Sequence, residues 1–507
     1  MLPPPDALPT LGELLQRAVE RHGDRVFLVG ESRQETFAEA GARVERTAGW
    51  LAARGVGAGD RVVLQGSNSP ALIGAWLAAV RLGALPVPVS PALTRPELDR
   101  VLDDTEPRAV LADGQRAETA RAAAGVRRIA AAPLDDPEIE GCTAPAPARP
   151  AVRPGDPAVL VYTSGTTSRP KPVIVTHAAL VLSGEAFPSW IGLGAEERLW
   201  ACLPLSHMNA QAYSLTTAIA HGYSLAVTPR FSASAFWREA AALGVTAANV
   251  IGAMLEILAR TPPDRWVPSG LRVLYTAPAP APERRAELER RFGVRLVSGY
   301  GMSESPFGCI ESDTSAAKAS CIGRPRLHPW RPVTNELRVV DGDGRPLARG
   351  ETGELQLRNP TVSPGYWGAA RQRSPDDWLA TGDLGYIDAD GDVILAGRSK
   401  EMIRRRGENI APGEIEDALL AHPAVLSAAA VGIPSALSEE DVAAVVVLRD
   451  GAAADPGELR RWCGERLADF KVPDVIAIRS ALPMTPTMRV ARRQLADELA
   501  GEARADA

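Results

Sequence analysis

The 507-residue sequence lacks the segments that direct a chain into or across a membrane. None of its apolar runs approaches the roughly 20 residues needed to cross a bilayer. The N-terminus, MLPPPDALPT, has neither the basic segment nor the apolar stretch of a signal peptide. A basic tail is also missing, and 56 basic against 62 acidic side chains give a formal charge of −6. We therefore expect a cytoplasmic protein that binds neither membranes nor nucleic acid.

Paired cysteines are missing as well. The five cysteines are an odd number, are widely spaced and include no CxxC pair, which argues against a zinc site or a redox couple and favours a reducing compartment. Hydrophobic residues make up 45% and charged residues 23%, which is ordinary globular composition. At about 150 residues per domain, the length allows three to four units, or one large domain with a smaller partner.

Short apolar runs alternate with longer segments of helical period between residues 61 and 298, which is typical of a parallel sheet covered by helices. The pattern occurs in two blocks, separated by an Ala/Pro/Asp-rich connection at residues 133–157. The second block includes a helix predicted near residues 209–220. Two such blocks predict a doubly wound α/β core.

After residue 332 the pattern changes to short alternating strands with glycine turns, DGDG and DADGD, which predict a small β subdomain of barrel type. A separate α+β unit begins after residue 397. We predict a large N-terminal domain at residues 1–396, made of two doubly wound subdomains and the β subdomain. A linker at residues 397–400 then joins it to a small C-terminal domain at residues 401–507.

The densest group of phosphate-compatible side chains lies in AVLVYTSGTTSRPKPVIVTH, positions 158–177. A buried strand is predicted to run into Thr163, and Lys171 closes the hydroxyl-rich loop that follows. Polyphosphates bind many neutral donors together with a point charge. The second glycine and the GK[ST] ending of a Walker loop are absent. A phosphate-binding loop is therefore predicted, with a solvated Ser/Thr loop as the competing interpretation.

Together with three later segments, this loop resembles the adenylate-forming superfamily of acyl-CoA synthetases, nonribosomal adenylation domains and luciferases. The loop is similar to the family's YTSGTTGxPKG, and LPLSHMNAQAY is similar to its LPLxH segment. SGYGMSES resembles GYGxTE, and WLATGDLGYIDADGDVILAGRSKEMI resembles the aspartate and arginine signatures with the interdomain hinge. The matches follow the family's order over most of the chain. The resemblance implies ATP and Mg²⁺ as cofactors and a rotating small domain, with Lys400 at its hinge.

The resemblance also implies a role for each matching residue. Lys171 offsets charge on the leaving pyrophosphate, and Glu304 with Thr167 holds Mg²⁺. Asp383 accepts from the ribose hydroxyls, and Tyr300 stacks on the base. The implied nucleotide-binding set is Thr163, Ser164, Gly165, Thr166, Thr167, Thr276, Ala277, Pro278, Tyr300, Gly301, Ser303, Asp383 and Arg398.

The acid is expected to bind beside His207, which the resemblance places between the acyl pocket and the nucleotide. A purely structural histidine is the competing interpretation. The candidate pocket walls combine apolar and amphipathic surfaces, which suit an aryl or medium acid better than acetate. These walls are Trp190, Met208, Asn209, Tyr213, Val250, Ile251 and Met302.

The C-terminal part departs most from the family. Its PxTxxGK-like ending, whose lysine bridges the substrate carboxylate and the α-phosphate, reads LPMTPTMRV here, with Met488 for the glycine and Arg489 for the lysine. Arginine keeps the charge but presents a planar fork in place of a compact ammonium. In IRRRGEN, Arg406 replaces the first glycine of a loop beside the pantetheine tunnel. The three arginines there form either a tunnel-lining cation or a solvated basic face.

The sequence therefore predicts an AMP-forming acid–CoA ligase, in which a carboxylic acid and ATP give acyl-AMP and pyrophosphate and CoA then displaces AMP. No protein nucleophile is required, because the enzyme positions the attack and neutralises charge. An alternative keeps adenylation but transfers the acyl group to an amine, a carrier protein or an inorganic nucleophile such as nitrite. A nucleotide-binding pseudoenzyme is the third possibility.

Overall fold

The structure is a computed structural model of the full chain. It describes residues 7–31, 33–114, 116–163, 170–262, 266–277, 279–312, 318–369, 373–374, 376–398, 401, 403–405, 408–410, 412–435, 440–467, 469–485 and 489–505, with backbone only for residues 398, 404, 408–409 and 503–505. None of the described helices combines the length and the apolar character that a bilayer crossing requires. All five cysteines are free.

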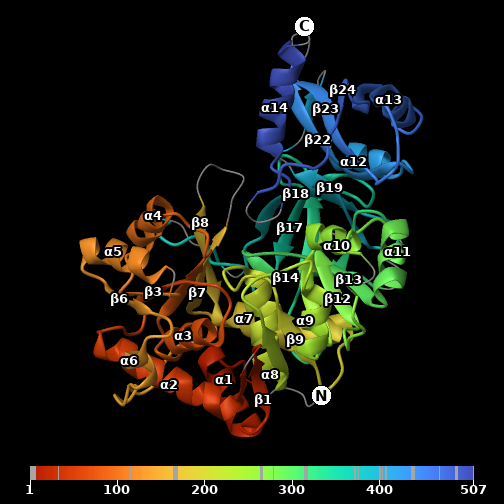
Figure 1. The fold of residues 1–507 in the computed structure, drawn as a ribbon. Coiled ribbons are helices and arrows are strands. Elements are labelled where there is room, and N and C mark those ends of the chain that lie inside the picture. Colours follow the sequence, from red (N-terminus) through yellow and green to blue (C-terminus); the bar gives the residue numbers. More distant parts are fainter. Residues whose placement is uncertain are drawn as a thin grey trace.

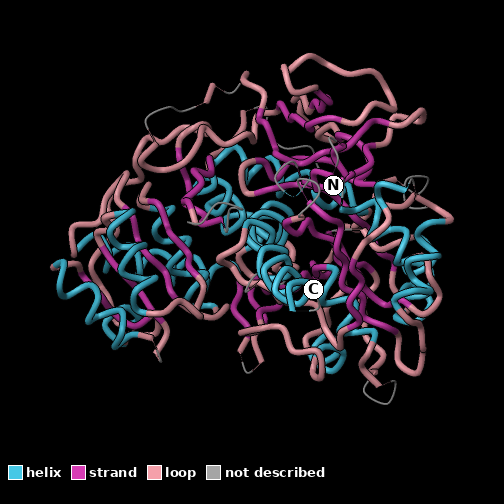
Figure 2. The backbone as a smooth tube through the Cα atoms, turned by 90° about the horizontal axis from the view of Figure 1, so that it is seen from above, coloured by secondary structure: helices cyan, strands magenta, loops and turns pink. Residues whose placement is uncertain are grey.

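A four-stranded parallel sheet forms the first lobe (Figure 1). Its order is β4(Leu85–Val89), β3(Arg61–Gln65), β5(Ala109–Ala112), β6(Ala130–Pro133). Helices α2(Phe37–Ala53), α3(Pro70–Arg81), α4(Arg95–Thr105) and α5(Ala117–Arg127) connect and surround these strands, and Figure 2 shows the lobe beside the rest of the chain. The predicted connection at residues 133–157 contains one helical turn, α6(Pro137–Glu140).

The hairpin of β7(Pro157–Thr163) and β8(Lys171–Thr176) lies next to this sheet, with β7 packed against β4. Helix α7(His177–Ile191) follows directly and enters the main hydrophobic core. The hairpin therefore places the ends of the predicted phosphate loop, Thr163 and Lys171, opposite each other in register.

A 13-stranded sheet forms the second part of the large domain. Its parallel section has the order β13, β12, β11, β9, β10, β1 and confirms the second predicted block. The strands of this section, with β2 on its outer edge, are β13(Arg295–Met302), β12(Val273–Ala277), β11(Ala247–Ile251), β9(Arg198–Ala201), β10(Ser224–Val227), β1(Val26–Val29) and β2(Gln34–Thr36). Helices α1(Leu11–His22), α9(Phe236–Ala242), α10(Gly252–Ala259) and α11(Pro282–Phe292) belong to the same part.

The predicted β subdomain continues this sheet through antiparallel strands. They are β14(Ser305–Ile310), β15(Cys321–Pro325), β19(Val393–Arg398), β18(Leu379–Ile387), β17(Gly353–Arg358) and β16(Glu336–Val340). Their inward side chains form a separate cluster that includes Leu355, Leu357 and Val393. Because β14 pairs with β13, the end of the parallel sheet and the β subdomain meet at the SGYG segment.

The predicted helix at residues 209–220 has an unexpected geometry. The segment from Ala210 to Thr216, η1, is a π-helix, and an α-helix, α8(Thr217–His221), continues it. Two hydroxyls stabilise the wider turns by donating five residues back, Thr216 Oγ1 to the Gln211 carbonyl at 2.8 Å and Thr217 Oγ1 to the Ala212 carbonyl at 3.3 Å. π-helical turns occur often at functional sites, and this one begins three residues after His207.

The C-terminal unit has its own core and confirms the predicted small α+β domain. A three-stranded sheet, β22(Val425–Pro434), β23(Glu440–Leu448) and β24(Val475–Ile478), packs with α12(Pro412–Leu420), α13(Pro456–Gly464) and α14(Arg492–Ala505). A short hairpin, β20(Ile403–Arg405) and β21(Glu408–Ile410), precedes it, and a single 3₁₀ turn, η5(Asp469–Lys471), follows α13.

Figure 1 shows the small domain in blue beyond the ends of β18 and β19. Helix α12 contacts β19, and the Ser320 hydroxyl donates to Asp417 Oδ2 at 2.9 Å. A longer ion pair joins Arg449 and Glu287 at 4.0 Å. Exposed polar contacts of this kind contribute little stability, so the observed placement of the small domain is compatible with movement.

Candidate active site

The predicted phosphate loop connects β7 to β8 along the chain. Thr163 Oγ1 donates to the Lys171 carbonyl at 3.5 Å, which marks the base of the loop. Four predicted phosphate-binding residues, Ser164, Gly165, Thr166 and Thr167, lie outside the described part of the chain. Lys171 is exposed at the first position of β8. Its ammonium is therefore accessible at the mouth of the loop.

Tyr366 links Lys171 to Glu304. The Lys171 ammonium stands 5.5 Å from the centre of the Tyr366 ring, and the Tyr366 hydroxyl donates to Glu304 Oε1 at 2.9 Å. Partial burial and the Glu304 charge raise the pKa of Tyr366 to about 12. Tyr366 therefore stays a donor at neutral pH. It brings the predicted phosphate and metal residues together, and sequence reasoning missed it.

Backbone bonds hold this arrangement from both sides. Tyr366 pairs with Val173 of β8 through an isolated antiparallel bridge, and the Ile174 N–H donates to the Gly365 carbonyl at 2.9 Å. The Ser363 N–H donates to the Glu304 carbonyl at 2.7 Å. The segment around Ser363 thus connects the phosphate hairpin to the turn that carries Glu304.

Glu304 occupies the turn between β13 and β14, where Met302 pairs with Ser305. Ser303 precedes it on the same turn. A buried network fixes the start of β14, because Asn359 Nδ2 donates to Ser305 Oγ at 3.2 Å and to the Phe307 carbonyl at 2.8 Å. The Glu304 oxygen that accepts from Tyr366 is Oε1. A carboxylate of this kind suits Mg²⁺, which is usually bound by one or two carboxylates together with substrate phosphates.

Asp383 is bound directly to Tyr300. The Tyr300 hydroxyl donates to Asp383 Oδ2 at 2.5 Å, although the two residues are 83 positions apart. Asp383 is only 6% exposed, and its N–H donates to Thr381 Oγ1 at 3.1 Å. Burial and the Asp383 charge raise the pKa of Tyr300 well above its usual value. The two residues form a prearranged pair, a contact that the sequence did not predict.

The remaining nucleotide-binding candidates lie on neighbouring strands. Thr276 pairs with Val250 on one side and Ser298 on the other, and Ala277 follows it at the end of β12. Thr276 is fully buried, and its Oγ1 has no hydrogen-bond partner within the described residues. Buried hydroxyls are normally paired, so this atom is suited to a ligand. Pro278 lies outside the described part of the chain, whereas Gly301 is exposed beside Tyr300.

Arg398 is the last residue of β19 and faces Asp383 across the β18–β19 ladder. Its backbone position places it near the ribose-binding candidate. Its side chain is not among the described ones, and Lys400 and Arg406 also lie outside the described residues.

Arg405 corrects one of the two alternatives for the basic cluster. Its guanidinium is only 7% exposed and donates to the carbonyls of Phe470 and Val472 at 3.0 and 3.1 Å and to Asp474 at 2.5 Å. A solvated face is therefore wrong for this residue, which instead joins the β20 strand to the segment before β24. The sequence missed this because its partners are about 65–70 positions away.

The positive charge of Arg489, in the small domain, acts on His207 of the large domain. Burial and the nearby charge of Arg489 lower the pKa of His207. Two hydrogen bonds tie Arg489 to Thr485: the Thr485 N–H donates to the Arg489 carbonyl at 2.7 Å, and the Arg489 N–H donates to Thr485 Oγ1 at 3.1 Å. The charge of the small-domain tail therefore reaches the predicted acid-binding segment in this structure. Met488 lies outside the described residues.

The predicted pocket residues differ in how deeply they are buried. Met208 and Val250 are buried, whereas Asn209, Ile251 and Met302 are half-buried. The carbonyl oxygen of Asn209 and the Ser206 hydroxyl are buried without a partner among the described residues. Trp190 lies farther along α7, where its indole N–H donates to the Leu327 carbonyl at 3.2 Å.

Comparison with known proteins agrees with this arrangement. Residues 15–367 match the family described as AMP-binding enzyme, and residues 414–489 match the AMP-binding enzyme C-terminal domain. The sulfoacetate–CoA ligase of Cupriavidus necator is 33% identical over 97% of this chain and 98% of its own length. The feruloyl-CoA synthase of an Amycolatopsis species is 33% identical over 91% of this chain and 93% of its own.

Two solved structures share the whole fold. ATP-bound MatB from Rhodopseudomonas palustris is 26% identical with a TM-score of 0.87, covering 97% of this chain and 99% of its own. The O-succinylbenzoate coenzyme A synthetase of Bacillus subtilis, in complex with AMP, is 28% identical with a TM-score of 0.82, covering 95% and 97%. The chain therefore belongs to the AMP-binding enzyme family, which confirms the predicted adenylate-forming superfamily and its class of AMP-forming ligases.

Proposed function

We propose that the protein is an acid–CoA ligase that uses ATP and Mg²⁺ to convert a carboxylic acid into its acyl-CoA thioester. The observation that carries this proposal is the connection of Lys171, Tyr366 and Glu304 beside the predicted phosphate loop. The relatives named CoA ligases cover more than nine tenths of the chain and support the choice of acceptor.

The first half-reaction joins the acid to the nucleotide. A carboxylate oxygen attacks the α-phosphorus of ATP, a new C–O–P linkage forms, and pyrophosphate leaves. Lys171 and the loop offset charge on the leaving pyrophosphate. Glu304 would hold Mg²⁺, which would supply further charge neutralisation there. Asp383 accepts hydrogen bonds from the ribose hydroxyls in this proposal.

We infer that Arg489 is the cation that binds the carboxylate of the acid. The lowered pKa of His207 keeps its imidazole neutral at pH 7. A neutral imidazole can orient the carboxylate by a hydrogen bond but does not attract it as a charge. The Arg489 guanidinium supplies that positive charge, at the sequence position where the family has a lysine. We infer that Arg489 has taken over the bridging role with a different geometry.

The second half-reaction transfers the acyl group. The sulfur of CoA attacks the carbonyl carbon of acyl-AMP, and the bond to the phosphate oxygen breaks to release AMP. Residues 397–400 are the proposed hinge about which the small domain rotates between the two steps. The few polar contacts between the domains are compatible with such a rotation.

A panel of acids tests the proposed function directly. Pyrophosphate release is measured for each acid with and without CoA, together with AMP release and thioester formation. We expect acid-dependent pyrophosphate release and CoA-dependent AMP release. Adenylation without any CoA-dependent turnover would favour a different acceptor, such as an amine or a carrier protein. No acid-dependent pyrophosphate release at all would contradict the proposal.

A further inference from the structure

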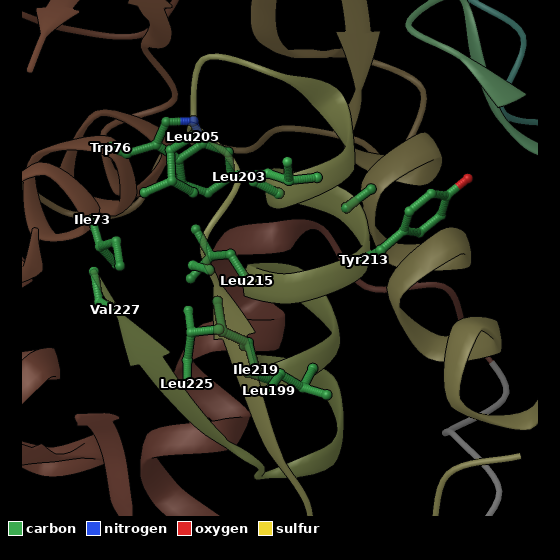
Figure 3. Packing of buried hydrophobic residues seen from close by; sticks show 14 of the residues in the cluster. Ile73, Trp76, Leu199, Leu203, Leu205, Tyr213, Leu215, Ile219, Leu225 and Val227 are labelled. Atoms are coloured by element: carbon green, nitrogen blue, oxygen red, sulfur yellow. The ribbon is translucent and has the colours of Figure 1, made fainter. Parts of the chain in front are cut away.

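Three aromatic side chains pack together where α7, η1 and β12 meet. Phe187 of α7 stacks on Tyr213 of η1, with ring centres 4.6 Å apart and an angle of 13°. Tyr275 of β12 meets both rings edge-on, at 5.1 Å from Phe187 and 5.5 Å from Tyr213. Figure 3 shows Tyr213 on the opposite side of its helix from the aliphatic residues Leu215 and Leu225, with its hydroxyl pointing away from them.

The two tyrosines reach the backbone of the SGYG segment. The Tyr213 hydroxyl donates to the Pro306 carbonyl. A Cβ atom added to Gly301 would stand 3.1 Å from the Tyr213 oxygen, and one added to Gly299 would stand 2.6 Å from the Tyr275 oxygen. Gly301 itself is exposed, whereas Tyr213 is only 5% exposed. The phenol of Tyr213 therefore lies directly beneath the exposed part of this segment.

Neighbouring contacts hold the Tyr213 ring in this position. It is stacked on one aromatic ring, meets a second edge-on, and is tied to β14 by its hydroxyl. Aromatic pairs of this kind stabilise a fold beyond the contribution of their buried area. A ligand that displaced the ring would lose these contacts and would also leave the buried Pro306 carbonyl without its donor. The Tyr213 ring is therefore expected to keep its position and not to move aside for a larger acid.

We propose that Tyr213 forms the floor of the acyl pocket and restricts the enzyme to small acids. The inference rests on the proposed function, since it takes the carboxylate to bind at His207, six positions earlier on the same segment. This inference differs from the expectation of an aryl acid. The sequence shows an aromatic residue near the predicted pocket, but it does not show how the ring of that residue is packed.

The experiment compares wild-type enzyme with Tyr213→Ala and Tyr213→Phe. Pyrophosphate release is measured with acetate, propionate, butyrate, hexanoate and benzoate as acids. In the wild type, kcat/KM for the preferred short acid should exceed that for benzoate by at least about ten-fold. Tyr213→Ala should gain at least about ten-fold with benzoate, whereas Tyr213→Phe, which keeps the ring, should retain the wild-type order of acids.

Wild-type enzyme that uses benzoate as well as any short acid would overturn the inference. So would a folded Tyr213→Ala with no gain for benzoate or hexanoate. Pyrophosphate release with none of the acids would instead refute the proposed function. Titration of wild type with acetyl- and benzoyl-sulfamoyl adenosine gives a second reading that needs no turnover and no variant. Tighter binding of the acetyl compound supports the small pocket, and equal or tighter binding of the benzoyl compound contradicts it.

Discussion

The proposed ribose side and the proposed carboxylate side of the site are built in different ways. Tyr300 and Asp383 both belong to the large domain, are buried, and are joined by a 2.5 Å hydrogen bond. His207 and Arg489 come from different domains, and Arg489 is exposed. The first pair is arranged before any ligand binds, whereas the second depends on where the small domain lies. The difference implies that nucleotide binding is a property of the large domain and that acid activation needs both domains.

The largest effect on activity is expected at the predicted phosphate loop, because both the proposed ribose side and the proposed carboxylate side depend on bound ATP. Thr166→Val combined with Lys171→Ala removes a hydroxyl and the ammonium that offset charge on the leaving group, so pyrophosphate release should fall below detection. The unfolding temperature should stay close to that of wild type, because Lys171 is exposed. Wild-type rates in the double variant would remove the loop from the site.

Arg489 gives the next largest effect. Arg489→Ala should slow single-turnover formation of acyl-AMP by about a hundred-fold, the usual cost of losing one charge-stabilising group in a transition state. Arg489→Lys should restore only part of the rate, since the ammonium and the planar fork differ in reach. Arg493→Ala, an exposed arginine in the following helix, serves as the control and should match wild type. Full recovery in Arg489→Lys would show that the fork has no role of its own.

Asp383 should affect affinity more than chemistry. Hydrogen bonds to a charged group contribute about 1.5–3 kcal/mol each, so Asp383→Ala should weaken ATP binding by at least about ten-fold. In wild type, 2′-deoxy-ATP should be a poor substitute for ATP, and the variant should not distinguish the two. Equal discrimination in both proteins would place the ribose elsewhere.

A smaller effect of pH is expected on the stability of the large domain, which carries Tyr300 and Asp383. His177 is buried, its Nδ1 accepts from the Leu11 N–H at 3.3 Å, and burial lowers its pKa to about 4. The unfolded chain, with a pKa near 6.5, takes up this proton first, so stability is lost as the pH falls from about 6.5 towards 4. Between pH 7 and 5 the loss should be about 2 kcal/mol.

Urea unfolding at the two pH values measures this loss. His177→Asn keeps an acceptor near the Nδ1 position but does not titrate, so its stability should change less over the same interval. An identical pH dependence in wild type and variant would assign the loss to other groups.

The sequence predicted well where a role depends on a local motif. For the segment before Thr163, the sequence predicted the strand that the structure shows as β7. It did not reveal Tyr366 or the contact between Tyr300 and Asp383, because these partners are 62 and 83 positions apart along the chain. No local pattern encodes such a pairing.

Two other features depended on information beyond helical or strand periodicity. Apolar spacing predicted a helix near residues 209–220, but hydroxyl bonds five residues back widen its first turns. The closeness of Arg489 to His207 depends on how the two domains are oriented, which a motif does not specify. The packing of Tyr213 likewise follows from three elements, α7, η1 and β12, that only the fold brings together.

The most direct test measures ATP affinity and the acyl-AMP rate side by side in Asp383→Ala and Arg489→Ala. If the two sides are built as described, Asp383→Ala should bind ATP at least about ten-fold more weakly. Arg489→Ala should bind ATP with near wild-type affinity yet form acyl-AMP about a hundred-fold more slowly. Loss of ATP affinity in Arg489→Ala equal to that in Asp383→Ala, or an unchanged acyl-AMP rate in Arg489→Ala, would contradict this division of roles between the domains.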